Sequence, residues 1–191
     1  MASRNDIITL PHADLRKKSA RVHVITDETH TLIADMTAAA LDWEDSRPHE
    51  VAVALAAVQI DRLERVVIVR ADFDDKTNRE FIPLINPEII KCEGDLVREH
   101  EGCLSVDHIY GMVPRYTKVR VRALNVDGQE IRLKAEGFVA RVLQHEIDHT
   151  NGITFVDHID QDHDAFYTLN PEGELESLAY DDVAARGIFR Q

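Results

Sequence analysis

Two histidines one helical turn apart, His145 and His149, limit the folds that this sequence can adopt. Phe138 and Val142 precede them at helical spacing, so a helix over residues 137–150 places all four side chains on one inward face. Burial of two imidazoles is unfavourable unless both rings find partners. The sequence therefore predicts a core helix whose surroundings satisfy these two rings.

Glu146 completes a His-Glu-x-x-His pattern, in which two imidazoles bind one metal ion and the carboxylate moves protons for a water molecule. An exposed, charged helix turn can carry the same letters by chance. A third ligand distinguishes the two interpretations. Cys103, in the run Glu101-Gly102-Cys103-Leu104-Ser105, is the best candidate because a thiolate complements two imidazoles. A free cysteine is otherwise commonly a small buried hydrophobe.

The composition favours a globular protein and excludes several classes. The 191 residues suffice for one domain with a sizeable core, and 44% are hydrophobic and 30% charged. No apolar run approaches the roughly 20 residues that span a bilayer, so we expect no membrane segment. A net charge of −13 argues against a DNA-binding surface. Two cysteines, with no apolar N-terminal stretch, predict a cytoplasmic protein, although an organelle stays open.

Hydrophobic periodicity predicts helices and strands in an α+β order. Residues 28–43 are spaced like an amphipathic helix with Asp27 as its N-cap. The helix over 137–150 should end at Asn151-Gly152. An acidic tail begins at about residue 161 of a single domain spanning 1–191, and it contains a short helix near 180–186.

Strands are predicted between the two long helices. Prolines in one of these runs favour an edge strand, and Asn125-Val126-Asp127-Gly128 is a turn signal that predicts a hairpin. The segments are a loop at 45–50, strands at 65–69 and 81–87 (the edge strand), and hairpin strands at 118–124 and 129–133.

Three motifs in order resemble those of the peptide deformylase family. Glu-Gly-Cys-Leu-Ser stands at 101–105, and Gln-His-Glu-x-Asp-His stands at 144–149. The family's Gly-x-Gly-Leu-Ala-Ala-x-Gln corresponds to residues 52–59, where Ala52 and Ala54 replace the glycines. The resemblance covers roughly residues 7–160. It implies antiparallel β-sheets packed around a central helix that carries His-Glu-x-x-His.

The resemblance also implies roles for individual residues. Cys103, His145 and His149 are expected to bind one divalent metal, natively Fe²⁺ and often Zn²⁺ or Ni²⁺ in preparations. Glu146 is expected to take a proton from water and deliver it to the leaving amine. The Gln59 amide and the Leu104 N–H are expected to stabilise the oxyanion while the N-formyl group leaves formyl-methionyl nascent chains as formate.

Residues on the expected substrate side follow from the helix face and the motifs. Gly102 permits close backbone approach, and Ala54 keeps the backbone groups for strand pairing but adds a methyl group. The proposed peptide-binding residues are Val53, Ala54, Gly102, Phe138 and Val142. Arg115 matches an arginine of the family's pattern and is expected to pair with Glu101 or Asp148.

Two alternatives to an active deformylase remain. The altered first motif is compatible with a deformylase-like protein of changed substrate or lost activity. The His-Glu-x-x-His pattern is also found in zincin metallopeptidases, which commonly use a third His or Glu instead of Cys103. Some deformylases dock on the ribosome through a basic C-terminal helix, and the acidic tail here weakens that expectation.

Overall fold

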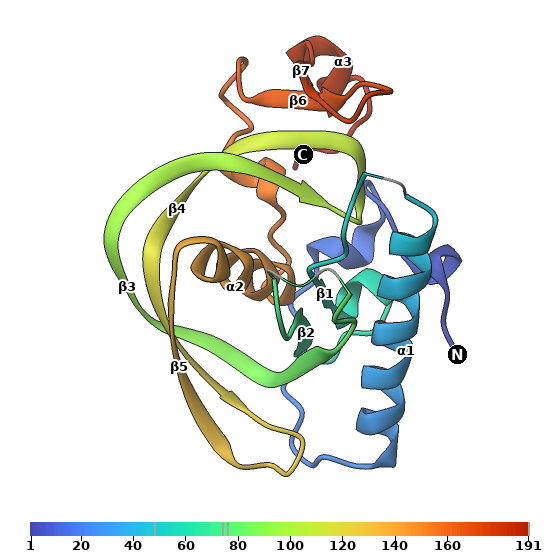
Figure 1. Cartoon of the computed structure of the whole chain (residues 1–191), viewed down its shortest axis with the longest axis vertical. Helices are drawn as coiled ribbons and strands as arrows, with labels where there is room; N and C mark the ends of the chain where they lie inside the picture. The colour runs from blue at the N-terminus through green and yellow to red at the C-terminus, as the bar shows by residue number, and fades with distance from the viewer. Residues whose placement is uncertain (48, 74, 76, 191) are drawn as a thin grey trace.

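The computed structural model describes residues 1–190 except 48, 74 and 76 (Figure 1). Within these residues, three α-helices and seven strands are joined by short 3₁₀ helices. The helices are α1 (Asp27–Asp45), α2 (Gly137–Thr150) and α3 (Tyr180–Ala184). The strands are β1 (Ala54–Ala56), β2 (Val66–Arg70), β3 (Phe81–Cys103), β4 (Val106–Leu124), β5 (Glu130–Glu136), β6 (Phe166–Leu169) and β7 (Leu175–Ser177).

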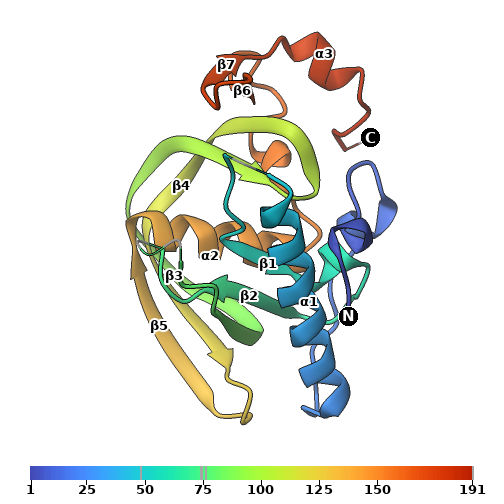
Figure 2. The same ribbon diagram turned by 45° about the vertical axis from the view of Figure 1, so that its right-hand side comes forward.

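All the strand pairs in this sheet are antiparallel, which confirms the predicted α+β class. The order is β1-β2-β3-β4-β6-β7, and β5 pairs with β4 on the edge opposite β3. The long strands β3 and β4 curl around α2, while α1 lies against β1 and β2 (Figures 1 and 2). The two chemical motifs therefore meet inside the curl, because the last residue of β3 is the cysteine and α2 carries the histidines.

Helix α2 begins and ends where the sequence predicts. Gly137 has a φ of +57°, and Asn151 and Gly152 end the helix, with a φ of +72° at Gly152. Val142, His145 and His149 are buried as expected. The prediction is wrong for Phe138, which is 50% exposed in the first turn of the helix, where it lines a cavity and contacts the Phe73 ring.

The strand that begins at Phe81 lies between β2 and β4, so the edge prediction is wrong for β3 as a whole, although residues 81–84 pair with β2 alone. It pairs with β2 through Ile85 and with β4 from Ile85 onward. Pro83 pairs only with β2, and Pro87 lies at a register shift in the ladder with β4. Both prolines are tolerated although they have no N–H, because Pro83 has a neighbouring strand on one side alone and Pro87 lies where the ladder is interrupted.

Smaller differences concern helix ends and turns. Thr26, not Asp27, caps α1, and the Thr26 N–H donates to Thr29 Oγ1 at 3.2 Å. The 125–128 turn joins β4 to β5, which confirms the hairpin. The short helix in the tail is confirmed as α3. Position 48 of the predicted 45–50 loop lies outside the described residues.

Gly152 is the glycine whose replacement we expect to be most costly. A Cβ there would lie 2.4 Å from the Arg16 carbonyl oxygen, and the φ of +72° adds backbone strain. Gly152→Ala should lower the free energy of unfolding by about 2–5 kcal/mol, from strain and overpacking together. Urea denaturation measures this change. Gly187→Ala is the control, because Gly187 has a similar φ of +66° but open space where a Cβ would lie. Equal losses in the two variants would contradict the steric explanation.

Candidate metal and catalytic site

Cys103, His145 and His149 come together as the sequence predicts. Cys103 Sγ lies 3.2 Å from His149 Nε2, which lies 3.2 Å from His145 Nε2. One ligand atom from each residue lies within 4.8 Å of the other two, which is close enough to hold one metal ion. Two imidazoles and one thiolate suit a borderline divalent cation such as Zn²⁺ or Fe²⁺. Burial lowers the pKa of His149 well below its usual value, which keeps this ring in the neutral form that binds metals.

A buried carboxylate orients the first histidine. His145 Nδ1 lies 2.9 Å from Glu101 Oε2, so the Nδ1–H donates to Glu101 and Nε2 faces the cluster. Arg115 donates to both Glu101 oxygens at 2.9 and 3.1 Å, and Arg141 donates at 2.7 Å. Burial raises the pKa of Glu101, but the hydrogen bonds from His145 and Arg115 outweigh it and hold the pKa well below its usual range. Glu101 is therefore ionised.

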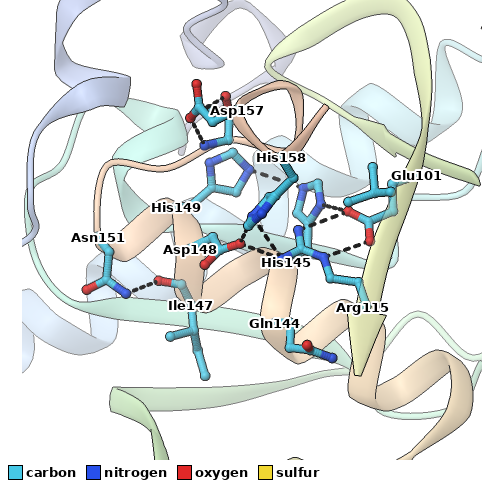
Figure 3. A network of polar contacts seen from close by, with 12 residues as sticks. Glu101, Arg115, Gln144, His145, Ile147, Asp148, His149, Asn151, Asp157 and His158 are labelled. Atoms are coloured by element: carbon cyan, nitrogen blue, oxygen red, sulfur yellow. Dashed lines mark hydrogen bonds and ion pairs between the residues drawn. The ribbon is translucent and has the colours of Figure 1, made fainter. Parts of the chain in front are cut away.

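The same arginine links the site to the end of α2. Arg115 Nη1 also donates to Asp148, and His158 Nε2 lies 2.7 Å from Asp148 Oδ2 (Figure 3). The expected pairing of Arg115 with Glu101 or Asp148 is thus satisfied with both. The Arg115 side chain is 4% exposed, so water cannot compensate its positive charge and the two carboxylates do so instead.

Gln59 presents its amide N–H to the cluster. Gln59 Oε1 accepts from the Ala56 N–H at 2.8 Å, which leaves Nε2 pointing toward Ser105 Oγ at 3.1 Å and Cys103 Sγ at 3.5 Å. Leu104 follows the cysteine in the turn between β3 and β4. The fixed Gln59 amide is a donor that can stabilise negative charge on a bound carbonyl oxygen, and the expected second donor is the N–H of Leu104, directly after the cysteine.

Glu146 lies beside the cluster with a free oxygen. The side chain is buried, and Glu146 Oε2 has no hydrogen-bond partner among the described residues. Burial, only partly offset by the nearby His145 ring, raises the pKa of Glu146 to about 7. A carboxyl group with a pKa near neutrality can both accept and donate a proton.

These groups open onto a cavity of about 420 Å³. This volume is in the range of small-ligand sites. Every residue predicted for the site lines the cavity except His149, which lies buried behind it. The predicted residues that line it are Val53, Ala54, Gln59, Gly102, Cys103, Leu104, Phe138, Val142, His145 and Glu146.

Sequence reasoning missed several residues of the cavity. Arg141 donates to Glu101, and its position four residues before His145 on the inward helix face is a usable signal. Glu50 accepts from the Tyr110 hydroxyl, and Arg47 Nη2 donates to Asp107 at 2.7 Å. These pairs join segments 60 residues apart, so no local pattern indicates them.

The comparisons with known proteins identify the family. The family model described as "Polypeptide deformylase" matches residues 4–165. The chain belongs to the peptide deformylase family. Family members remove the N-formyl group from nascent peptides in a metal-dependent hydrolysis.

Curated relatives and solved structures agree with this family. A peptide deformylase of Brachyspira hyodysenteriae is 45% identical over 91% of this chain and 87% of its own length. One from Thermomicrobium roseum is 40% identical over 91% of this chain and 96% of its own. The crystal structure of a peptide deformylase from Synechococcus elongatus with actinonin has a TM-score of 0.72 at 33% identity, covering 80% of this chain and 78% of that one. None of the described helices is both long and apolar enough to cross a membrane.

The Arg115 network should stabilise the fold as well as the site. Arg115→Leu leaves Glu101 and Asp148 short of a partner, so we expect the free energy of unfolding of the metal-free protein to fall by about 3–5 kcal/mol. Chemical denaturation in the presence of a chelator measures it. Arg120→Leu removes an exposed pair with Glu93 and should cost less than about 1 kcal/mol. A loss at Arg115 no larger than the loss at Arg120 would refute the buried-charge argument.

Proposed function

We propose that this chain is an active peptide deformylase that hydrolyses the N-formyl group of formyl-methionyl nascent chains and releases formate. The observation that carries the proposal is a Cys103–His145–His149 cluster with the unpartnered carboxylate oxygen of Glu146 beside it, among the residues that the structure describes. The fixed Gln59 amide faces the same cluster. Together these groups supply a metal site, a proton carrier and an oxyanion donor at one end of one cavity.

The residues present fit a divalent cation, and we propose Fe²⁺ as the native one, with Zn²⁺ or Ni²⁺ as substitutes. The oriented Nε2 of His145, the neutral ring of His149 and the Cys103 sulfur form a two-nitrogen, one-sulfur donor set. When bound, such a cation lowers the pKa of a water molecule and polarises a carbonyl group. Three protein ligands leave room for water or substrate.

The remaining groups of the site then act on the substrate and on its proton. Glu146 accepts a proton from the attacking water and delivers it to the leaving amine, a double role that fits a pKa near 7. Gln59 Nε2 and the Leu104 N–H donate to the oxygen of the formyl carbonyl as it gains negative charge. Cleavage of the C–N bond releases formate and a free methionine amine.

The peptide is proposed to pair with the free edge of β1. Among the described strands β1 pairs only with β2, and Val53 O accepts from the Arg70 N–H. Because hydrogen bonding alternates along a ladder, the N–H and C=O of Ala54 point away from β2. They can bind an extended peptide by strand addition. The methionine side chain then enters the apolar part of the cavity formed by Val53, Phe138 and Val142.

The alternatives have less support. A zincin site commonly uses a third His or Glu, whereas in the described part of the chain the third member of the buried cluster is Cys103. An inactive relative has no need for Glu146 and Gln59 at these positions. The tail carries acidic residues, so we do not propose that a basic helix docks it on the ribosome. A cytoplasmic location follows from a nascent-chain substrate.

Activity is tested by release of formate from formyl-Met-Ala-Ser under anaerobic conditions. We expect the wild-type protein loaded with Fe²⁺ or Ni²⁺ to be active and Glu146→Gln to reduce kcat by about 10²–10⁴-fold, because the proton carrier is lost. The metal content of both proteins, determined by mass spectrometry, should be the same. An inactive wild-type protein with full metal content would overturn the proposed function, and an active Glu146→Gln variant would overturn the mechanism.

The two alanines of the first motif can be tested separately, because they lie in different surroundings. Ala54 lines the cavity, whereas Ala52 is fully buried in the core beneath α1 and does not line it. Neither is among the positive-φ residues of the described chain, so backbone strain is not the issue. If the Ala54 methyl group narrows the peptide site, Ala54→Gly should raise kcat/KM for formyl-Met peptides by about 10-fold. Ala52→Gly is the matched control and should bring no gain. An unchanged kcat/KM in Ala54→Gly would count against narrowing.

A further inference from the structure

The hairpin of β6 and β7 begins one residue beyond the segment that the family model matches. It nevertheless extends the sheet that carries the site. Tyr167 pairs with Tyr110 and Phe166 with Gly111, and the Met112 N–H donates to Ala165 O at 2.8 Å. Phe166 is 1% exposed in a core cluster shared with β4. The hairpin is therefore a fixed part of the sheet and lies at the outer end of β3 and β4 (Figure 1).

The turn of this hairpin reaches the cavity. Leu169, Gly173 and Leu175 line the same cavity as Cys103 and Glu146. The turn also approaches the segment that leads into β1. A Cβ at Gly173, where φ is +84°, would lie 3.0 Å from His49 Cγ. The cavity is thus bordered by the catalytic cluster at one end and by the hairpin and His49 at the other.

Hydrogen bonds preorganise the turn. Asn170 Oδ1 accepts from the N–H groups of Glu172 and Glu174 at 3.1 and 2.8 Å, and Asn170 Nδ2 donates to Glu176 at 3.1 Å. Leu169 and Leu175 pair directly across the two strands. A turn held in this way can offer two leucine side chains to a ligand with little further loss of entropy.

The charged groups at this end of the cavity are already paired. Tyr110 donates to Glu50, and Arg47 contacts Glu50 at 3.2 Å and Asp107 at 2.7 Å. These ions and the hydroxyl bind one another, so they are not free to bind a ligand. The two leucines beside them add an apolar surface. An apolar side chain suits such a surface better than a charged or hydroxyl-bearing one.

The proposed substrate pose leads a peptide to this surface. The catalytic groups lie at the Gln59 end of the β1 segment, so a formyl group placed there leaves the rest of the chain to run back past Ala54 and Val53 toward His49. An extended chain advances about 3.3 Å per residue. The residues that follow the methionine therefore approach the hairpin rather than the metal cluster.

We propose that Leu169 and Leu175 form a subsite that selects an apolar side chain carried downstream of the formyl-methionine. This proposal rests on the proposed function and adds a specificity determinant from outside the segment matched by the family model. Selection acts on the peptide sequence that follows the first residue, so it changes kcat/KM among substrates and not the chemistry of deformylation.

The test compares kcat/KM for formyl-Met-Ala-Leu and formyl-Met-Ala-Ser. In the wild type we expect the leucine peptide to be favoured by about 10-fold. Leu175→Ser, at a side chain already 37% exposed, and the Leu169→Ser/Leu175→Ser double variant should bring this ratio toward one. Leu96→Ser is the matched control, because Leu96 is 59% exposed and does not line the cavity, and its ratio should match the wild type. A wild-type ratio of one, or a ratio unchanged in both hairpin variants, would overturn the subsite.

A binding measurement separates this proposal from the proposed function. Trp43 is the single tryptophan of the chain and lines the cavity, so its fluorescence reports peptide binding without turnover. Titration of the wild type with the unformylated peptides Met-Ala-Leu and Met-Ala-Ser should show tighter binding of the leucine peptide, and Leu175→Ser should abolish the difference. If formate release is absent but this difference is present, the deformylase proposal fails and the subsite stands. Equal binding of the two peptides by the wild type contradicts the subsite whatever the activity.

Discussion

The ionised carboxylate of Glu101 is the interaction on which the rest of the site depends. It lies on β3, accepts hydrogen bonds from Arg115 of β4 and Arg141 of α2, and orients the ring of His145. A buried charge is tolerated only when its partners are in place. These partners reach the carboxylate only when β3 and β4 curl together and α2 is packed inside them. The geometry of the proposed metal ligands follows from that requirement, because Cys103 is two residues further along the same strand.

Electrostatics and apolar burial act on different sides of α2. One side of the helix faces the charged network, which Arg115 extends to Asp148 and His158 near its C-terminal end (Figure 3). Leu143 and Ile147 belong to the apolar cluster shared with β1, β2 and β4. The helix is thus held by directional contacts on one side and by non-directional packing on the other, which fixes its rotation. Rotation matters because His145, Glu146 and His149 must face different groups.

The sequence predicts the residues and the chemistry of the site better than it predicts the strands that position them. The bounds of α2, its termination at Asn151-Gly152 and the meeting of Cys103 with both histidines follow from local spacing and ligand chemistry. The length of β3 does not, because residues 90–92 and 94–100 are exposed and show no apolar alternation. That part of the strand is stabilised by its ladder with β4 and by cross-strand ion pairs such as Arg120 with Glu93. The Glu50–Tyr110 contact and the hairpin beside the cavity join residues that are far apart in the sequence, so no local pattern predicts them.

The separation of the proposed metal ligands along the chain has a consequence for folding. Cys103 and His149 are 46 residues apart, and β4, β5 and most of α2 lie between them. A cation held by both residues would close this stretch into a loop, as a covalent cross-link does. Partly unfolded chains that still held the cation would therefore have less conformational freedom. Binding to the native fold also adds the free energy of association to that of folding. Removal of a cation bound at this site would therefore lower the stability of the native fold as well as the activity.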